Sequence, residues 1–444
     1  MKELSRRNTF FVGLLLFSMF FGAGNLIFPP FLGQVSGKYV WIAFGGFIIS
    51  AVGLPILAVV IVSKSKGLYN LASHVSPTFA IIFTIIIYLS IGPFLGIPRT
   101  GSLAFTMGVQ PFLPKSIISS PIPLFIYTLV YFGIAFWLSL TPSKLINRLG
   151  KILTPILLLL IFIVFIKSLI TPIGPFGVPK GDYSSFPFFK GFSEGYLTMD
   201  AIAALNFGIV ITYALKSLEV TGEKAIISYS IKAGLIVGAL LIVIYAMLSY
   251  VGASSRIISL NAQNGGEILT NAASHLFGGS GIIILGLIFT LACLNTATGL
   301  ITSCSEYFSI ISKNKISYRT WAFIFAFSSM LFANVGLTNI LSFSVPVLNA
   351  IYPMAMVLML CFLLNNLFSG SKYVYILVML FTSIFSILDS LNQTVIHSKS
   401  ITNLFDILPL YTKGLGWIVP SILGFIIGYF IYLLTRNKDA IPSN

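Results

Sequence analysis

Charged residues are scarce in this sequence, and acidic residues are the scarcest of them. Only 8% of the 444 residues are charged, with 11 Asp and Glu against 26 Lys and Arg, while 57% are hydrophobic. A soluble domain carries about 25% charged residues, so this composition excludes an ordinary water-soluble fold. The sequence therefore predicts a polytopic membrane protein whose solvent is largely the lipid bilayer.

The basic excess does not point to a nucleic-acid partner. A formal net charge of +15 would suggest nucleic-acid binding in a soluble protein. Here no basic face or stacking platform accompanies the charge, and the Lys and Arg residues of membrane proteins gather in cytoplasmic loops. We therefore expect no binding of nucleic acid.

Residues for metal or nucleophilic chemistry are also few. The chain holds three cysteines and three histidines, namely Cys293, Cys304, Cys361, His74, His275 and His397. The cysteines lie inside apolar runs without disulfide or metal-ligand spacing, and the histidines fall in separate predicted loops. A membrane-embedded enzyme would need such groups to converge, so we expect neither an enzyme nor a bound cofactor.

Long apolar runs are what the sequence has in abundance. Crossing about 30 Å of hydrocarbon takes about twenty apolar residues in a helix, and no strand-like alternation competes with this pattern. We predict an all-α membrane protein with about twelve transmembrane helices. They are placed at Thr9–Leu32, Tyr39–Val62, Thr78–Met107, Pro123–Leu140, Ile152–Ile170, Phe192–Leu215, Ile226–Val251, Gly281–Ile310, Thr320–Gly336, Thr338–Leu364, Val374–Leu388 and Leu415–Thr435.

Basic residues are unevenly divided between the two sides of these spans. The side of the termini carries Lys2, Arg6, Arg7, Lys64, Lys66, Lys144, Arg148, Lys151, Lys216, Lys224, Lys232, Lys313, Lys315, Arg319, Lys372, Arg436 and Lys438. The opposite side carries about half as many. Because loops rich in Lys and Arg stay in the cytoplasm, both termini are predicted to be cytoplasmic.

The segment Phe21–Pro30, with the sequence F-G-A-G-N-L-I-F-P-P, is expected to break the first span. Glycine permits non-helical dihedral angles, and proline lacks an N–H donor. Unwound backbone is tolerated at membrane depth only where it is buried in protein or lines a cavity. Amides at a helix N-terminus suit a carboxylate, so we predict that substrate binds at Gly22, Ala23, Gly24 and Asn25. A simple proline kink is the alternative.

A matching break is predicted in the sixth span, near Leu205–Gly208. The first span runs outward and the sixth inward, and paired breaks in oppositely directed helices are typical of secondary transporters with inverted repeats. They argue against a channel, which needs a filter or charged ring. We predict a five-plus-five inverted repeat with broken helices 1 and 6. Residues 1–172 form spans 1–5, residues 173–366 form spans 6–10, and residues 367–444 add two C-terminal helices and a tail.

The connection between the seventh and eighth spans contains a predicted amphipathic helix. Along Glu267–Phe277 the apolar residues recur on one helical face. On the orientation above this connection is external, so the helix is a candidate external lid.

Four motifs together resemble a known family. They are the segment Phe21–Pro30, Gly92-Pro93 with Ile97-Pro98-Arg99-Thr100, Gly195-Tyr196-Leu197-Thr198-Met199-Asp200-Ala201, and Leu294-Asn295-Thr296-Ala297 with Gly299-Leu300. In this order they are similar to the bacterial branched-chain amino acid:cation symporter family, over nearly the whole chain. The resemblance implies uptake of leucine, isoleucine and valine through the bacterial plasma membrane. It also implies coupling to a cation, usually sodium, on the fold of the bacterial leucine-transporter superfamily.

The eighth span carries a candidate cation site. Ala292, Asn295 and Thr296 lie at positions i, i+3 and i+4, so one carbonyl and two side-chain oxygens can converge on a sodium ion. The resemblance implies that carbonyls near Ser18 and Phe21 complete the site. Asn295 departs from the superfamily pattern, in which a Thr or Ser is expected. Polar helix packing is the alternative, and proton coupling stays open.

Charged residues inside spans are costly and therefore candidates for function. Asp200 lies in the sixth span, and Arg99 in the third span is expected to pair with Asp200 or with Glu194. We predict an outer gate or a carboxylate that senses protons or ions, with a structural pair as the alternative.

An aliphatic substrate also requires an apolar pocket beside the polar backbone. The candidates are side chains near the predicted break of the sixth span and in the third span. They are Ala204, Phe207, Gly208, Phe94 and Ile97.

Overall fold

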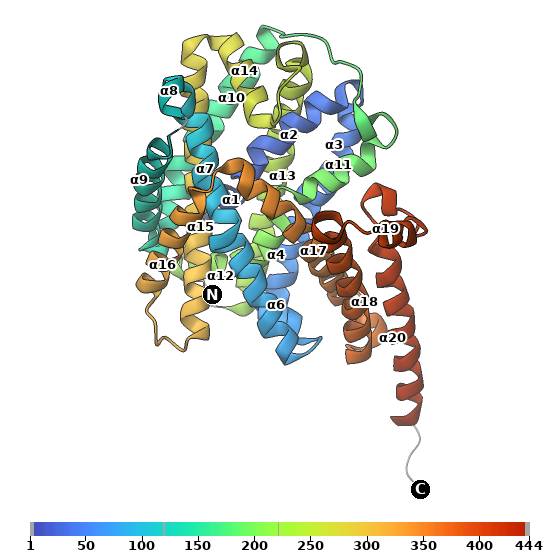
Figure 1. Ribbon diagram of the computed structural model, residues 1–444. Helices are drawn as coiled ribbons and strands as arrows, with labels where there is room; N and C mark the ends of the chain where they lie inside the picture. Colours follow the sequence, from blue (N-terminus) through green and yellow to red (C-terminus); the bar gives the residue numbers. More distant parts are fainter. Residues whose placement is uncertain (1–3, 119, 221, 440–444) are drawn as a thin grey trace. The chain divides into compact units, whose positions relative to one another are not determined.

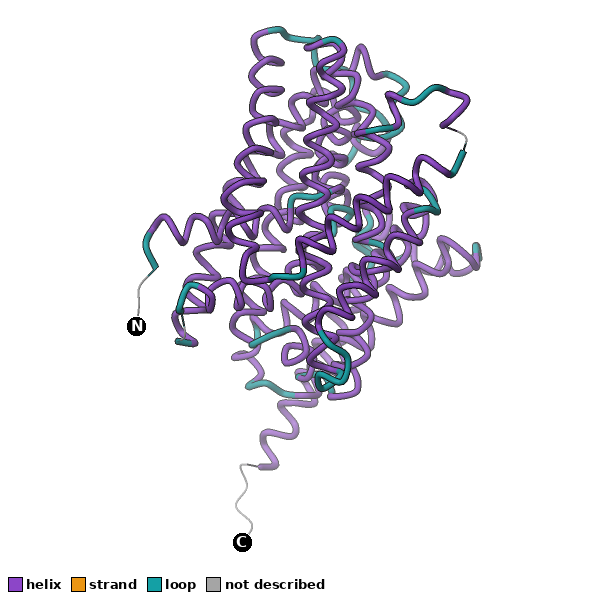
Figure 2. The backbone as a smooth tube through the Cα atoms, turned by 90° about the vertical axis from the view of Figure 1, so that its left-hand side faces the viewer, coloured by secondary structure: helices purple, strands orange, loops and turns teal. Residues whose placement is uncertain are grey.

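The structure is a computed structural model that describes residues 4–118, 120–220 and 222–439. Within these ranges every regular element is a helix (Figure 2). Helices satisfy their backbone hydrogen bonds internally, which is why long apolar runs adopt them in lipid. The predicted all-α membrane fold is thus confirmed.

By its internal contacts the chain divides into two compact units (Figure 1). The first comprises Met1–Ser63 and Tyr88–Ser342, and the second comprises Lys64–Ile87 and Phe343–Asn444. These units are defined by contacts and do not test the predicted repeat boundaries, which remain a prediction.

Twenty α-helices form the described part of the chain, with short 3₁₀ and π segments between some of them. They are α1 (Arg6–Phe20), α2 (Ala23–Ser36), α3 (Val40–Ile48), α4 (Leu54–Ser65), α5 (Leu68–Ser73), α6 (Pro77–Leu89), α7 (Gly96–Gly108), α8 (Lys115–Ile118), α9 (Ile122–Ser139), α10 (Thr154–Ile170), α11 (Pro187–Tyr196), α12 (Asp200–Ser217), α13 (Glu223–Ser254), α14 (Gly265–Phe277), α15 (Gly279–Ile311), α16 (Tyr318–Ala333), α17 (Leu337–Leu363), α18 (Lys372–Leu391), α19 (Lys399–Asp406) and α20 (Ile418–Asp439).

Ten helical stretches of the described residues are long and apolar enough to cross a membrane. They correspond to the predicted spans 2–8 and 10–12. The predicted first span is divided by a break into α1, of 15 residues, and α2. The predicted ninth span is α16, of 16 residues. Both fall short of the length of an uninterrupted crossing, and for the first span the break itself is the reason.

The two half-helices α2 and α11 each pack tightly against a neighbouring helix in the first unit. Figure 1 shows α2 beside α13, and α3 beside α11. A Cβ atom on Gly252 of α13 would lie 2.0 Å from the carbonyl oxygen of Pro30 in α2. A Cβ atom on Gly46 of α3 would lie 1.9 Å from the carbonyl oxygen of Phe188 in α11. Only glycine allows backbones to approach so closely, so each half-helix is held along its length.

The predicted amphipathic helix before the eighth span is confirmed as α14. Its N-terminus is capped by the Asn264 side chain, which accepts a hydrogen bond from the Glu267 backbone N–H at 3.0 Å. Its apolar face is buried against α2 and α15. The lid function assigned to it remains a prediction.

The second unit is built around the packing of α18 against α20. Two glycines of α20, Gly424 and Gly428, face the α18 backbone near Val378 and Val374, where a Cβ atom would lie 2.8 and 2.7 Å from the respective Cα atoms. Beyond the end of α18, Tyr411 donates a hydrogen bond to Asp389 Oδ1 at 2.9 Å. Burial and this carboxylate raise the pKa of Tyr411 to about 12.

Candidate functional site

The first break lies between α1 and α2, at Phe21 and Gly22. Gly22 has φ −123° and ψ −148°, outside the helical region, and its N–H donates to Asn25 Oδ1 at 3.1 Å. The predicted break is confirmed at Phe21 and Gly22, but it is shorter than the predicted segment Phe21–Pro30, because Gly24 lies inside α2. Pro29 and Pro30 lie inside α2, which continues through them to Ser36.

The second break lies earlier in the chain than predicted. It occupies Leu197–Met199, between α11 and α12, and Met199 has a left-handed conformation with φ 72°. The predicted position, Leu205–Gly208, is helical throughout. Gly208 serves packing instead, because a Cβ atom there would lie 2.4 Å from Val62 Cγ1. Placing the break at this glycine was therefore wrong.

The two breaks are joined by a buried hydrogen-bonded group. Asn25 of α2 donates through Nδ2 to Asp200 Oδ2 at 2.5 Å and also to the Tyr245 hydroxyl. Tyr245, on α13, donates to the same Asp200 oxygen at 2.9 Å. All three side chains are buried. Asp200 stands in the first turn of α12, where the helix dipole favours a negative charge. Tyr245 was missed from the sequence, where its only signal is a hydroxyl deep in an apolar run.

Arg99 of α7 reaches the second break from the opposite direction. Its Nη1 donates to the Leu197 carbonyl at 3.2 Å and its Nη2 to the Thr198 carbonyl at 3.4 Å. Only 5% of the side chain is exposed, and its charge and that of Asp200 attract each other. No ion pair joins Arg99 and Asp200 among the described residues, because the guanidinium bonds to the break carbonyls, so the predicted pairing stays a prediction.

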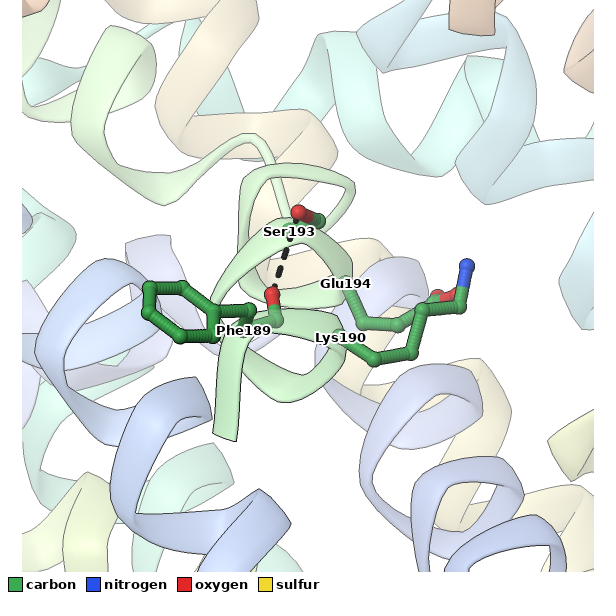
Figure 3. A network of polar contacts seen from close by, with 4 residues as sticks. All are labelled: Phe189, Lys190, Ser193 and Glu194. Carbon is green, nitrogen blue, oxygen red and sulfur yellow. Dashed lines mark hydrogen bonds and ion pairs between the residues drawn. The ribbon is translucent and has the colours of Figure 1, made fainter. Parts of the chain in front are cut away.

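Glu194, the third member of the predicted charge cluster, has a different partner. Figure 3 shows it beside Lys190 on α11, where the two side chains form an ion pair at 3.0 Å. Ser193, next to it, donates to the Phe189 carbonyl at 3.1 Å. The structure therefore separates Glu194 from the interaction of Arg99 with Asp200.

The candidate cation residues lie beside the first break. The Thr296 hydroxyl of α15 donates to the Ser18 carbonyl of α1 at 3.4 Å. A Cβ atom on Gly22 would lie 2.5 Å from this hydroxyl oxygen, so glycine is needed for α15 to approach the break. Phe21, the other predicted carbonyl ligand near this break, follows the last residue of α1 and directly precedes Gly22. This approach brings the Ser18 carbonyl and the Thr296 hydroxyl together, while the complete predicted cation site stays a prediction.

Asn295 and Ala292 lie on the same helix and are fully buried. Neither the nitrogen nor the oxygen of the Asn295 amide has a hydrogen-bond partner in the structure. An unpaired buried amide costs about 1–3 kcal/mol, so the Asn295 amide has hydrogen-bonding capacity that the surrounding side chains do not use. Among the described residues, no three His, Cys, Asp or Glu side chains gather as metal ligands, so a cation here would rely on neutral oxygens.

The predicted apolar pocket is only partly brought together. Phe207 of α12 is buried and packs edge-to-face on Phe20, the last residue of α1, with ring centroids 5.3 Å apart. Ala204 and Ile97 are buried as well. Phe94 is different, because 46% of it is exposed and its ring packs on Phe332 of α16.

The chain resembles known proteins over nearly its whole length. Residues 5–435 match the family described as branched-chain amino acid transport protein. The chain is 46% identical to the branched-chain amino acid permease BrnQ of Bacillus subtilis, covering 99% of this chain and 100% of that one. It is 39% identical to the branched-chain amino acid transport system 2 carrier protein of Pseudomonas aeruginosa, covering 97% of both.

Two solved structures share the fold. One is a nucleobase-cation-symport-1 family transporter in a closed conformation with bromovinylhydantoin bound, with a TM-score of 0.63 at 13% identity over 97% of this chain and 93% of that one. The other is the Eremococcus coleocola manganese transporter, with a TM-score of 0.56 at 14% identity over 97% of both chains. At these identities the likeness shows the fold alone.

Proposed function

Because the chain belongs to the branched-chain amino acid transport protein family, we propose that it imports leucine, isoleucine and valine by symport with a cation. Sodium is the proposed coupling ion, and alternating access around the two helix breaks is the proposed mechanism. The observation that carries the proposal is the buried group of Asn25, Asp200 and Tyr245, which ties the two breaks together. The family is one of transport proteins, so the chain is not an enzyme, as the sequence predicts.

The breaks provide the groups that an amino acid requires. The first-turn amides of α2, from Ala23 onward, have no partner within the helix and carry the positive end of its dipole, which suits a carboxylate. The Leu197 and Thr198 carbonyls, which accept hydrogen bonds from Arg99, each have a second lone pair that is the proposed acceptor for the ammonium group. Phe20 and Phe207 give the apolar surface for an aliphatic side chain.

The proposed sodium site is the contact of α1 with α15. Its oxygens would be the carbonyls of Ser18, Phe21 and Ala292, the Thr296 hydroxyl and the Asn295 amide oxygen. Neutral oxygens of this kind suit a hard monovalent cation. The hydrogen bond between Thr296 and Ser18 and the unpaired amide of Asn295 support the assignment.

By the distribution of basic residues, both termini are proposed to lie in the cytoplasm of a bacterial cell.

A proton-coupled mechanism is the second candidate, because the buried carboxylate of Asp200 is a group that can carry a proton. Uptake of labelled leucine into proteoliposomes under an imposed sodium gradient or an imposed proton gradient separates the two. Accumulation driven by sodium alone is the expected result. Accumulation driven by protons alone would assign the coupling to the second candidate, and no accumulation under either gradient would refute import of leucine.

Replacing Thr296 by alanine is expected to raise the sodium concentration for half-maximal uptake about tenfold, which corresponds to one lost oxygen ligand or hydrogen bond. The matched control is Thr298→Ala on the same helix, because the Thr298 hydroxyl donates only to the Leu294 carbonyl of α15 itself. Sodium titration of leucine uptake measures both variants. An equal shift in the two variants, or no shift in Thr296→Ala, would contradict the proposed site.

A further inference from the structure

The guanidinium group of Arg99 lies against the first turn of α2 as well as against the second break. Its Nη2 is 2.9 Å from the point that a Cβ atom on Gly24 would occupy. The Thr198 Cα atom lies 3.0 Å from the same point. Glycine at this position therefore lets Arg99 and the second break reach the positive end of the α2 dipole.

Arg99 still has hydrogen-bonding capacity at this place. A guanidinium carries five N–H donors, and the two hydrogen bonds of Arg99 to the Leu197 and Thr198 carbonyls are long, at 3.2 and 3.4 Å. Its Nε is buried and has no hydrogen-bond partner. An arginine that is 95% buried and incompletely bonded would be expensive to maintain for packing alone.

The nearby carboxylate does not use these donors. Asp200 accepts hydrogen bonds from Asn25 and from Tyr245 through the same oxygen, Oδ2. Arg99 instead contacts the break carbonyls and the Gly24 position. The Arg99 guanidinium thus lies at the positive end of α2. An anion other than Asp200 that binds at this place can accept hydrogen bonds from both.

We propose that Arg99, together with the first-turn amides of α2, binds the carboxylate group of the substrate. This inference rests on the proposed function. It names Arg99 as the residue that requires the substrate to carry a free carboxylate group. Arginine binds a carboxylate through two parallel N–H···O bonds, and burial strengthens such charge-assisted bonds. A role limited to supporting the break, through the Leu197 and Thr198 carbonyls, predicts no such requirement.

The test compares leucine with leucinamide, which keeps the ammonium group and side chain but has no carboxylate. In the unmodified protein, leucine should inhibit labelled-leucine uptake at least about 100-fold more strongly than leucinamide, as expected for a site built to bind the missing group. In Arg99→Gln this ratio should fall at least about tenfold. Arg99→Lys keeps the positive charge but lacks the paired N–H donors of the guanidinium, and it should give an intermediate ratio.

The ratio is measured within each variant, so it does not depend on the amount of folded protein. Where a variant binds but does not transport, the concentration of each ligand that raises the melting temperature in detergent gives the same ratio. Gly24→Ala is a second variant, because its methyl group would displace the Arg99 head and press on the Thr198 backbone while leaving the Arg99 charge in place; it too should lower the ratio.

The matched control is Arg256→Gln. Arg256 is also a buried arginine that donates to a backbone carbonyl, that of Gln34 near the C-terminal end of α2, at 2.9 Å. It should keep the ratio of the unmodified protein. An unchanged ratio in Arg99→Gln would overturn the assignment of Arg99 alone. Absence of leucine uptake and leucine binding in the unmodified protein would instead refute the proposed function.

Discussion

Replacing Gly46 by alanine is expected to destabilise the protein strongly, whereas replacing its neighbour Gly45 is not. A Cβ atom on Gly46 would lie 1.9 Å from the Phe188 carbonyl oxygen and 3.0 Å from the Phe192 nitrogen, which are backbone atoms of α11. They cannot rotate away, so α3 and α11 must separate, at an expected cost of at least about 2 kcal/mol. Thermal unfolding in detergent and the yield of folded protein measure the effect.

Gly45 provides the control within the same helix. A Cβ atom there meets nothing within 4 Å, so Gly45→Ala changes only helix propensity and should be neutral or stabilising by up to about 1 kcal/mol. Gly191 of α11 faces the Ala43 carbonyl from the other side, with a Cβ distance of 1.9 Å, and Gly191→Ala should behave like Gly46→Ala. Equal stability of the Gly45 and Gly46 variants would contradict the close packing of α11 on α3.

The helical membrane fold was predictable because it follows from composition and from the length of apolar runs. The first break was predictable too, because glycine permits non-helical backbone and Gly22 adopts it, whereas Gly24 lies inside α2. The predicted break extends to Pro29 and Pro30, but both prolines lie within α2 and the helix continues through them. Proline thus indicates a lost hydrogen bond, and whether the helix breaks there depends on its tertiary neighbours.

The second break was not predictable from glycine. Its left-handed residue is Met199, a side chain that rarely adopts that conformation, and the nearby Gly208 serves packing against Val62. A local signal was present in Asp200, since an acidic residue inside an apolar span is typical of the first turn of a helix. The strain at Met199 is maintained by the surrounding structure, which a single sequence does not reveal.

The candidate site was predictable by residue type but only partly by position. The approach of Thr296 to Ser18 joins residues far apart in the chain. Helical spacing alone predicts only the residues of the eighth span. Glu194 and Phe94 were placed in the site because they stand in the right spans. The structure gives them Lys190 and Phe332 as neighbours. Orientation around a helix depends on packing, which the sequence of one helix does not determine.

Replacing Asp200 by asparagine is expected to lower the initial rate of leucine uptake at least about 100-fold. An asparagine retains the shape and an oxygen that can accept from Asn25 and Tyr245, so the helices should remain joined. The charge is lost, however, and the buried guanidinium of Arg99 is left without the attraction of this carboxylate. A 100-fold lower rate corresponds to about 2.7 kcal/mol of activation free energy, which is the size expected for losing a buried charge at the link between the two breaks. Labelled-leucine uptake in proteoliposomes, over a range of sodium concentrations and pH, measures the effect.

The sharpest control is Asp389→Asn, because Asp389 has closely similar local chemistry in the second unit. Its carboxylate accepts a hydrogen bond from the Tyr411 hydroxyl at 2.9 Å and from the Gln393 amide at 3.0 Å, just as Asp200 accepts from a tyrosine and an amide. Asp389→Asn should therefore retain most of the uptake if the effect at Asp200 arises from its place between the two breaks. Equal losses in both variants would indicate a general cost of removing a carboxylate from a span. Unchanged uptake, pH dependence and ion dependence in Asp200→Asn would refute a functional charge there and leave Asn25 and Tyr245 as the structural link between the breaks.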